Sequence, residues 1–552
     1  MSIKKLLASL AVFLLPLAMF AQETVKKGLD ERINDAVVPI AKAVEGVVFF
    51  PIVVSGNSIP IVLILLVGAA LYFTIYFGFP NFTKIGLAIN VVRGKYDNSA
   101  DDPIEDENDT RSEVGDLDAP TTLDGDSGKT APVEDHHGEV TAFQALTSAL
   151  SATVGLGNIA GVAIAIAVGG PGATFWMILA GFLGMASKFT ECTLGVKYRE
   201  IGPDGTVYGG PMYYLSKGLG SKNMAGLGKG LAIFYAIMMV GGSFGGGNMF
   251  QANQAAAQFT AMVGSDATWL GTVFGIVTAI LVAVVILGGI KRIGQVAERI
   301  VPFMVGVYVL ASLIVIIANY QYIGAAFGQI FNGAMTGGGI AGGFLGVLIQ
   351  GFRRAAFSNE AGVGSASVAH AAVRTKYPAS EGVVALLEPF IDTVVVCTMT
   401  ALVIIFFNMG GAFEYGGTGA VTMIATGEMV DGVNLTAAAF ENVIPGFSYV
   451  LTIAVILFAF STMLSWSYYG LQAWKFLFGK STLADYTYKG LFLMFIVIGS
   501  AASLGAVVSF SDAMIFAMIF PNMIGLVILA PQVKEEMAKY LAAIRSGKLD
   551  VE

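Results

Sequence analysis

Long apolar runs separated by short polar loops recur along most of this chain of 552 residues. A transmembrane helix needs about 20 consecutive apolar residues, and each of these runs is long enough. The pattern predicts eleven transmembrane helices, near residues 59–79, 142–167, 171–196, 228–262, 268–289, 297–319, 337–371, 383–408, 447–470, 486–506 and 511–531. We therefore expect an all-α polytopic membrane protein.

Two of the apolar runs are interrupted near their middle, at Ser151–Val162 and at Ser358–Val368. An offset of 207 residues places Gly155 and Gly157 of the first run on Gly362 and Gly364 of the second. A broken helix at bilayer depth leaves backbone groups unpaired, and this is tolerated only beside a polar cavity or inside protein. Two discontinuous helices at corresponding positions of two halves are typical of a secondary-transporter binding site.

The predicted helices after the first form two sets of five, and each set opens with an interrupted helix. Because five spans separate the two openers, they run in opposite directions, as in a 5+5 inverted repeat. Lysine and arginine are missing from alternate loops, namely 168–170, 263–267, 320–336, 409–446 and 507–510. Since basic residues concentrate in cytoplasmic loops, we expect a cell inner membrane protein with a periplasmic N-terminus and a cytoplasmic C-terminus.

The composition agrees with a membrane protein: 55% of the residues are hydrophobic and 13% are charged, where a soluble domain has about 25% charged residues. This balance excludes a soluble enzyme. The net charge of −8 comes from one segment, because residues 97–139 hold fifteen acids and two bases, a net of −13 that leaves +5 elsewhere. The predicted organisation is a signal peptide (1–22), a periplasmic interfacial amphipathic helix (23–58), a first transmembrane helix with its cytoplasmic link (59–95), an acidic disordered cytoplasmic insert (96–138), a first inverted repeat (139–320), a second inverted repeat (321–531) and a cytoplasmic tail (532–552).

Three of the acids inside the predicted spans are candidates for chemistry. Glu360 lies in the second interruption, where an unpaired charge is costly, and Arg353 and Arg354 are its nearest candidate partners along the sequence. Glu360 is either a proton or cation site or a structural acid that satisfies the broken backbone. Glu388 and Asp392 lie four residues apart in the eighth span, and they have either paired structural roles or a role in ion coupling.

A glycine-rich stretch and a hydroxyl-rich stretch supply further candidates. Residues 241–251 expose bare backbone, with Asn248 and Gln251 as neutral polar groups; the stretch is either a ligand wall or a site of tight helix packing. In the ninth span the hydroxyls of residues 461, 462 and 465 share one helical face. Such oxygens suit Na⁺, although hydroxyls in a helix also bond back to the preceding turn. Trp466 could close one side of a ligand pocket.

Metal and redox chemistry have little support in the sequence. The two cysteines, Cys192 and Cys397, lie in apolar spans without a disulfide framework or a metal motif. His136 and His137 at the end of the acidic insert are more readily explained as solvated residues than as metal ligands. We expect Na⁺ as the only metal and no organic cofactor.

Five motifs in order closely resemble the alanine/glycine:cation symporter family, that is, the sodium:alanine symporters. They are Thr153–Gly161, Gly209–Tyr214, Gly247–Asn253, Phe357–Ser365 and Phe460–Gly470. The resemblance implies a leucine-transporter-like fold, Na⁺ coupling and small neutral amino acids as substrates. It implies substrate contacts from Thr153, Gly155, Gly157, Asn158, Gly246, Gln251, Thr462 and Trp466. It implies Na⁺ ligands among Val154, Gly155, Ser461 and Thr462.

The resulting prediction is a secondary active transporter that takes up alanine or glycine together with Na⁺ by alternating access. The alternative is an H⁺-coupled small amino acid symporter that uses Glu360 or Asp392, and Ser358, Asn359, Glu360 and Asp392 are the candidate gating or coupling residues. No catalytic cluster is recognisable, so the chain is not expected to be an enzyme. The expected partners are the small neutral amino acid and the lipid bilayer, with no nucleic acid and no obligate protein partner.

Overall fold

The computed structural model describes residues 39, 43, 45–54, 57–96, 138–203, 205–264, 269–337, 343–417 and 419–549. The predicted signal peptide, most of the predicted interfacial helix and residues 97–137 of the acidic insert lie outside the described residues. Within the described part of the interfacial region, residues 45–48 are helical. The prediction of a helix is wrong for the end of this region, because β1 (Pro51–Val54) and β2 (Asn57–Pro60) pair as an antiparallel hairpin.

The described part of the chain is mostly helical, because apolar segments in a bilayer must satisfy their backbone groups internally. The helices are α3 (Ile61–Tyr76), α4 (Pro80–Thr83), α5 (Ile85–Val92), α6 (Ala142–Thr153), α7 (Val162–Gly169), α8 (Gly172–Lys197), α9 (Pro211–Tyr213), α10 (Ala225–Phe244), α11 (Phe250–Val263), α12 (Trp269–Ile286), α13 (Gly289–Ala318), α14 (Ile323–Thr336), α15 (Gly343–Asn359), α16 (Ala366–His370), α17 (Pro378–Ala385), α18 (Leu387–Pro389), α19 (Thr398–Phe407), α20 (Gly432–Glu441), α21 (Phe447–Phe478), α22 (Thr482–Ala501) and α23 (Leu504–Arg545).

Among the described residues, eight helices are long and apolar enough to cross a membrane, or nine if the bent pair at 142–169 is one span. The shorter apolar helix α3 adds 16 residues near the predicted first span. The helix α23 is longer than predicted, since its 42 residues continue to Arg545, into the region expected to be a tail.

The described residues contain four π-helical segments. One is Tyr214–Gly218, and the other three lie at Gly157–Gly161, Gly245–Met249 and Phe390–Cys397. The π-helix is rare and frequently occurs at functional sites. Two of the three coincide with the glycine-containing motifs of the sequence, and the third contains Asp392.

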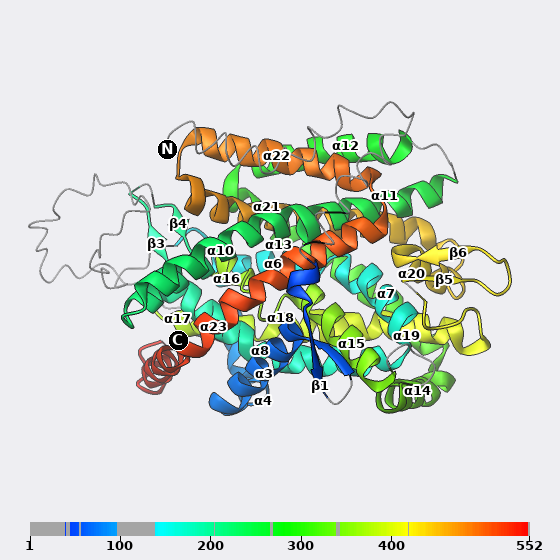
Figure 1. Cartoon of the computed structure of the whole chain (residues 1–552), viewed down its shortest axis with the longest axis horizontal. Helices are drawn as coiled ribbons and strands as arrows, with labels where there is room; N and C mark the ends of the chain where they lie inside the picture. Colours follow the sequence, from blue (N-terminus) through cyan, green and yellow to red (C-terminus); the bar gives the residue numbers. More distant parts are fainter. Residues whose placement is uncertain are drawn as a thin grey trace, which may run out of the picture.

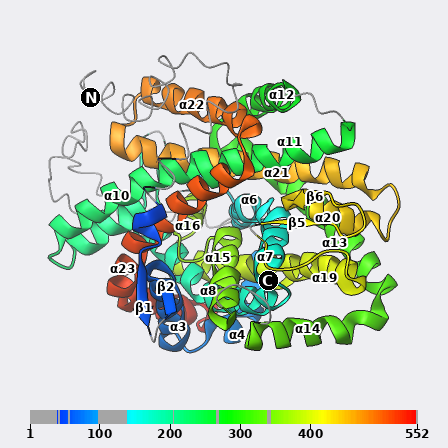
Figure 2. The ribbon, with the colours of Figure 1, turned by 45° about the vertical axis from the view of Figure 1, so that its right-hand side comes forward.

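The long helices α10, α21 and α23 run side by side across the molecule in both views (Figures 1 and 2), and α10 packs against both of the others. The helices α7, α8 and α15 pack against one another. The helix α6 packs on α21, and α15 packs on α8. This arrangement brings both interrupted segments to the buried interior, next to the glycine-rich part of α10.

Small β-hairpins lie outside the helical body. The strands β3 (Glu200–Ile201) and β4 (Val207–Tyr208) follow α8, and β5 (Ala420–Thr422) pairs with β6 (Met429–Asp431) within the long loop 409–446. That loop also contains α20, which packs on the first interrupted segment.

Candidate functional site

The first interruption opens where α6 ends at Thr153. A capping box between Thr141 and Gln144 starts this helix. Its axis bends by 48° before the chain resumes a helical path at Gly157. Val154 at the end of α6 has φ −78° and ψ 83°, outside the helical region. The break lies where the sequence pattern predicts it.

Side-chain amides hold the freed N–H groups at this break. The N–H of Gly155 donates to Asn158 Oδ1 at 2.8 Å, and the N–H of Leu156 donates to Gln251 Oε1 at 3.1 Å. The amide nitrogen of Gln251 donates in turn to the carbonyl of Gly246 at 2.9 Å. The two N–H groups are therefore satisfied by neutral oxygens, which an anionic group can displace because charge-assisted hydrogen bonds are roughly twice as strong.

The helix α21 forms the opposite wall through its hydroxyl-bearing face. Thr462 Oγ1 donates to the carbonyl of Ser151 at 2.9 Å, and Ser151 Oγ donates to the carbonyl of Ser461 at 2.7 Å. A Cβ atom at position 155 would lie 2.3 Å from Thr462 Oγ1, so only glycine permits this approach. Ser461 instead bonds back to the carbonyl of Phe458 at 3.0 Å.

The glycine-rich stretch at residues 241–251 contributes some residues that face the break and others that only pack against neighbouring helices. A Cβ atom on Gly246 would lie 2.4 Å from Ile515 Cδ1, and one on Gly247 would lie 2.2 Å from Trp466 Cγ. Asn248 points away from the break and donates to the carbonyl of Phe492 at 2.6 Å. The glycine-rich stretch thus supplies both a bare surface and tight helix packing.

Trp466 and Glu360 contact each other, which the sequence did not predict. The indole N–H of Trp466 donates to Glu360 Oε1 at 2.9 Å, and Ser365 bonds to the second carboxylate oxygen. The prediction that Arg353 or Arg354 pairs with Glu360 is wrong, because both arginines bind a different acid. Arg353 Nε lies 2.9 Å from Asp512 Oδ2, and Arg354 binds the same oxygen. Asp512 lies 159 and 158 residues beyond Arg353 and Arg354 in the sequence, so a search for partners among neighbouring residues does not find it.

Asp392 joins the two interruptions. Its Oδ1 accepts from Asn158 Nδ2 at 2.6 Å in the first, and its Oδ2 accepts from Ser358 Oγ at 2.9 Å in the second. Thr393 Oγ1 donates to the same Oδ2 at 2.7 Å, and Asn359 Nδ2 donates to Thr393 Oγ1 at 2.9 Å. A Cβ atom on Gly157 would lie 3.2 Å from Ser358 Cα. The two breaks are thus in direct contact.

The other predicted residues have local roles. Thr153 Oγ1 bonds back to the carbonyl of Ala149 at 3.2 Å within its own helix. Glu388 does not pair with its neighbour Asp392 but binds Lys188 Nζ at 3.1 Å and His370 Nε2 at 2.6 Å. All of the predicted site residues are buried, so the site is shielded from both surfaces of the protein.

The helix α20 covers the first interruption, and the sequence analysis did not predict this helix. From α20, Thr436 Oγ1 donates to the carbonyl of Ile159 at 3.2 Å, and the N–H of Val433 donates to Gln254 Oε1 at 3.0 Å. The carbonyl of Ile159 belongs to the π-helical turn of the first interruption. The apolar residues of 433–440 inside an otherwise polar loop were the available signal for a buried helix.

A buried polar site between two interrupted apolar helices, covered by a loop helix, defines a membrane transporter. A sequence model of the sodium:alanine symporter family matches residues 126–552. The chain belongs to the sodium:alanine symporter family.

Relatives agree with this assignment. The sodium/alanine symporter AgcS of Methanococcus maripaludis is 41% identical over 404 residues, which are 73% of this chain and 84% of that protein. The probable sodium/glutamine symporter GlnT of Bacillus subtilis is 33% identical over 415 residues, 74% of this chain and 80% of that protein. A crystal structure of MhsT in complex with L-phenylalanine is 14% identical and covers 72% of this chain and 99% of that chain with a TM-score of 0.48, and we draw nothing from so low a score. The relatives are named transporters, and the chain is a transporter, not an enzyme.

Proposed function

We propose that this protein takes up small neutral amino acids of the alanine and glycine type together with Na⁺, by alternating access across the cell inner membrane. One observation carries the proposal. At the first interruption, the N–H groups of Gly155 and Leu156 both donate to side-chain amide oxygens, with the Thr153 carbonyl as a second acceptor for Gly155, and the Thr462 hydroxyl lies against Gly155. Exchangeable N–H donors and cation-binding oxygens therefore lie side by side.

The amino acid carboxylate binds at these N–H groups in our proposal. It displaces the oxygens of Asn158 and Gln251 and lies at the start of the helical segment 157–169, where the helix dipole is positive. The substrate side chain then faces a wall built from Gly246, Ile515 and Trp466. This wall is closely packed, since a single added Cβ at Gly246 would lie 2.4 Å from Ile515. Such packing favours alanine and glycine over larger amino acids.

Na⁺ binds beside the carboxylate, between the carbonyl oxygens of Val154 and Gly155 and the hydroxyls of Ser461 and Thr462. Both hydroxyls already donate their protons, Ser461 to the carbonyl of Phe458 and Thr462 to the carbonyl of Ser151. A hydroxyl that has given up its donor to a carbonyl keeps its lone pairs for a cation. The backward bond of Ser461 is thus compatible with a ligand role.

The driving force is sufficient with one Na⁺ per amino acid. A membrane potential of 100 mV supplies about 2.3 kcal/mol per charge, and a tenfold Na⁺ gradient adds about 1.4 kcal/mol. The sum of about 3.7 kcal/mol supports roughly 500-fold accumulation of a zwitterion. The Asn158–Asp392–Ser358 contacts then let the two interrupted helices move together between outward- and inward-facing states.

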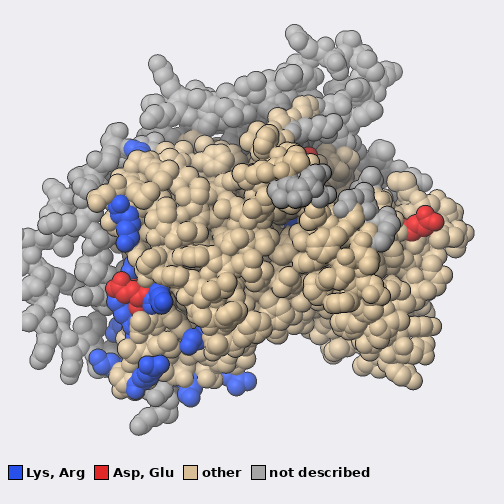
Figure 3. Space-filling model, turned by 60° about the horizontal axis from the view of Figure 1, so that its bottom comes forward, with Lys and Arg blue, Asp and Glu red and all other residues tan. Residues whose placement is uncertain are grey.

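The proposed topology has eleven spans, the last ten as a 5+5 inverted repeat in a leucine-transporter-like fold, with a cleaved signal peptide. The α15–α16 segment and the short helix α3 supply the two spans beyond the nine apolar ones. Lys and Arg side chains gather at one end of the face in Figure 3, and this supports a cytoplasmic end with the C-terminus there.

Uptake of radiolabelled alanine into proteoliposomes tests the proposal. We expect accumulation when Na⁺ is higher outside and the interior is negative, and unlabelled glycine should compete. Accumulation that persists without Na⁺ and follows an imposed pH gradient would replace Na⁺ by H⁺ as the coupling ion. Absence of accumulation under either gradient would overturn coupled transport.

A further inference from the structure

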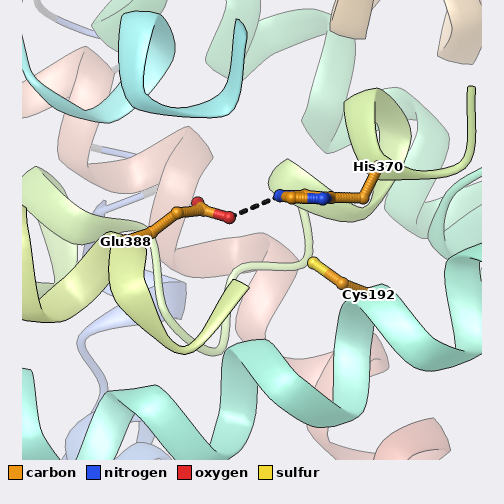
Figure 4. A group of neighbouring side chains, drawn as sticks. All are labelled: Cys192, His370 and Glu388. Atoms are coloured by element: carbon orange, nitrogen blue, oxygen red, sulfur yellow. Dashed lines mark hydrogen bonds and ion pairs between the residues drawn. The ribbon is translucent and has the colours of Figure 1, made fainter. Parts of the chain in front are cut away.

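A second buried polar cluster takes no part in the hydrogen bonds of either interruption. Cys192 on α8, His370 at the end of α16 and Glu388 on α18 point toward a common centre (Figure 4). One donor atom from each residue lies within 4.8 Å of the other two. All three side chains are fully or almost fully buried, with exposed fractions of 0%.

The imidazole ring is held in a fixed orientation by a carboxylate. His370 Nδ1 lies 2.8 Å from Glu381 Oε2, so that the opposite nitrogen, Nε2, faces Glu388 Oε1 at 2.6 Å. The other oxygen of Glu388 is held by Lys188 Nζ at 3.1 Å. Histidines that ligate metals almost always donate their second N–H to a carboxylate, a carbonyl or water in this way. The ring therefore presents Nε2 to the centre, together with one oxygen of Glu388.

We propose that Cys192, His370 and Glu388 form a binding site for one zinc-type divalent cation. Thiolate, imidazole and carboxylate are the donors that Zn²⁺ takes, at about 2.0–2.3 Å. To hold one ion, His370 Nε2 and Glu388 Oε1 move apart from their 2.6 Å hydrogen bond, and the Cys192 sulfur, which lies within 4.8 Å of both atoms, completes the donor set. A fourth position remains for water. The sulfur and nitrogen donors separate this site from the proposed Na⁺ site, whose donors are oxygens.

The charges of the cluster are compatible with the exchange of two protons for one divalent cation. In the proposed metal-free state His370 is protonated, with Glu381 facing Nδ1 and Glu388 facing Nε2, so that its charge and that of Lys188 balance the two carboxylates. On binding, the ion takes the place of the Nε2 proton and of the Cys192 thiol proton, and both protons leave to solvent. One divalent cation then balances two protons, and the net charge of the buried cluster does not change. Metal affinity that depends on ligand deprotonation follows.

Three neighbouring charged residues make hydrogen bonds to neutral groups outside the cluster. Glu191 accepts from Asn522 Nδ2 at 2.9 Å. Arg199 donates to the carbonyls of Ala371 and Val373, next to His370 in the chain. Glu360 is held by Trp466. The three proposed ligands, at positions 192, 370 and 388, are far apart in the sequence, so no metal-binding spacing motif predicts them.

Cobalt binding to the purified full-length protein, stripped of metal by a chelator, tests the proposal. The probe is Co²⁺ alone, because a cysteine thiolate bound to Co²⁺ gives a charge-transfer absorption band in the near ultraviolet. The starting protein is the His136→Gln/His137→Gln variant, which removes the only other histidines. We expect one Co²⁺ per chain with the band, displacement by Zn²⁺, release of two protons per ion in weak buffer, and a higher unfolding midpoint with metal, since ligands that bind the native state stabilise it.

The matched variants are Cys192→Ser and Cys397→Ser, which change the two buried cysteines of the chain. The first should lose the band and the second should keep it. The unfolding midpoint of each metal-free variant confirms that it is folded. A parent protein without stoichiometric Co²⁺ binding, or a band that survives in Cys192→Ser, would overturn the site. Neither result bears on Na⁺-driven uptake, so the two proposals fail separately.

Discussion

The two interrupted helices look alike in sequence but differ in how their backbones are satisfied. At the first, Gly155 and Gly157 keep negative φ angles, and neutral amide oxygens hold the free N–H groups. At the second, Glu360, Gly362 and Gly364 have φ angles of 56°, 88° and 92°. These are left-handed conformations, which are disfavoured for residues with a side chain.

The partners of the second interruption also differ, because they come from surrounding helices. Tyr235 donates to the carbonyl of Val363 at 3.0 Å, and Asn522 donates to the carbonyl of Gly362 at 2.9 Å. These contacts fix the backbone through a strained path. The difference agrees with our proposal that the first break exchanges a ligand, while the second belongs to the scaffold, and Asp392 contacts both.

The largest effect should come from Gly362→Ala at the scaffold break. The alanine would have to keep the backbone φ of +88°, and its Cβ would lie 2.2 Å from Met523 Cε. A strained residue costs about 1–3 kcal/mol and overpacking about 1–3 kcal/mol more, so we expect a stability loss of about 2–6 kcal/mol and a much lower unfolding midpoint in detergent. The Gly490→Ala variant, which has open space around its Cβ, is the control. An unchanged midpoint for Gly362→Ala would contradict the scaffold role.

Next in size should be Gly155→Ala at the exchange break. Its Cβ would lie 2.3 Å from Thr462 Oγ1, so the proposed Na⁺ oxygens are forced apart while most of the fold is untouched. With an overpacking cost of about 1–3 kcal/mol, we expect Na⁺-driven alanine uptake to fall by roughly 10- to 100-fold. Gly161→Ala, whose Cβ would meet only one atom at 4.0 Å, should keep uptake near the parent rate. Equal loss in both variants would show that the effect is not specific to the contact with Thr462.

A smaller effect should follow from Asp392→Asn at the link between the breaks. The change removes charge-assisted hydrogen bonds from Asn158 and Ser358, and hydrogen bonds to charged groups contribute about 1.5–3 kcal/mol. The asparagine retains one acceptor, so we expect about a tenfold weaker apparent affinity for alanine and Na⁺. Asp485→Asn, which loses ion pairs with Lys475 and Lys489 on a partly exposed helix end, is the control. Parent-like affinities for Asp392→Asn would mean that the breaks are not coupled through this carboxylate.

The smallest effect should come from Glu441→Gln, which touches neither break. Hydrogen bonds from the Ser448 hydroxyl and from the N–H groups of Gly446 and Ser448 lower the pKa of Glu441. A carboxylate with a lowered folded-state pKa adds stability above its ordinary pKa, and this is lost as the pH falls through the lowered value. We expect the midpoint difference between parent and variant, worth about 0.3–1 kcal/mol, to be present at neutral pH and to vanish in acid. A difference that grows in acid would contradict this account.

The sequence predicted the two breaks and their glycines because broken apolar periodicity is a local signal. Contacts such as Gly155 with Thr462 rested on the family resemblance, since the two residues are 307 positions apart. The partner of Glu360 could not be predicted, because Trp466 lies 106 positions away and only packing decides between it, the nearby Ser365 and the two arginines. The hairpin at residues 51–60 was missed, although the Ser-Gly-Asn sequence between its apolar residues was an available turn signal.

Na⁺-dependent equilibrium binding of radiolabelled alanine to the purified protein tests the central claim most directly. We predict that the parent protein binds one alanine per chain, that the affinity rises with Na⁺ concentration, and that Gly155→Ala loses this binding while the folded fraction of Gly362→Ala retains it. Alanine binding that is independent of Na⁺, or that is unchanged in Gly155→Ala, would contradict the assignment of the first interruption as the shared site of amino acid and ion.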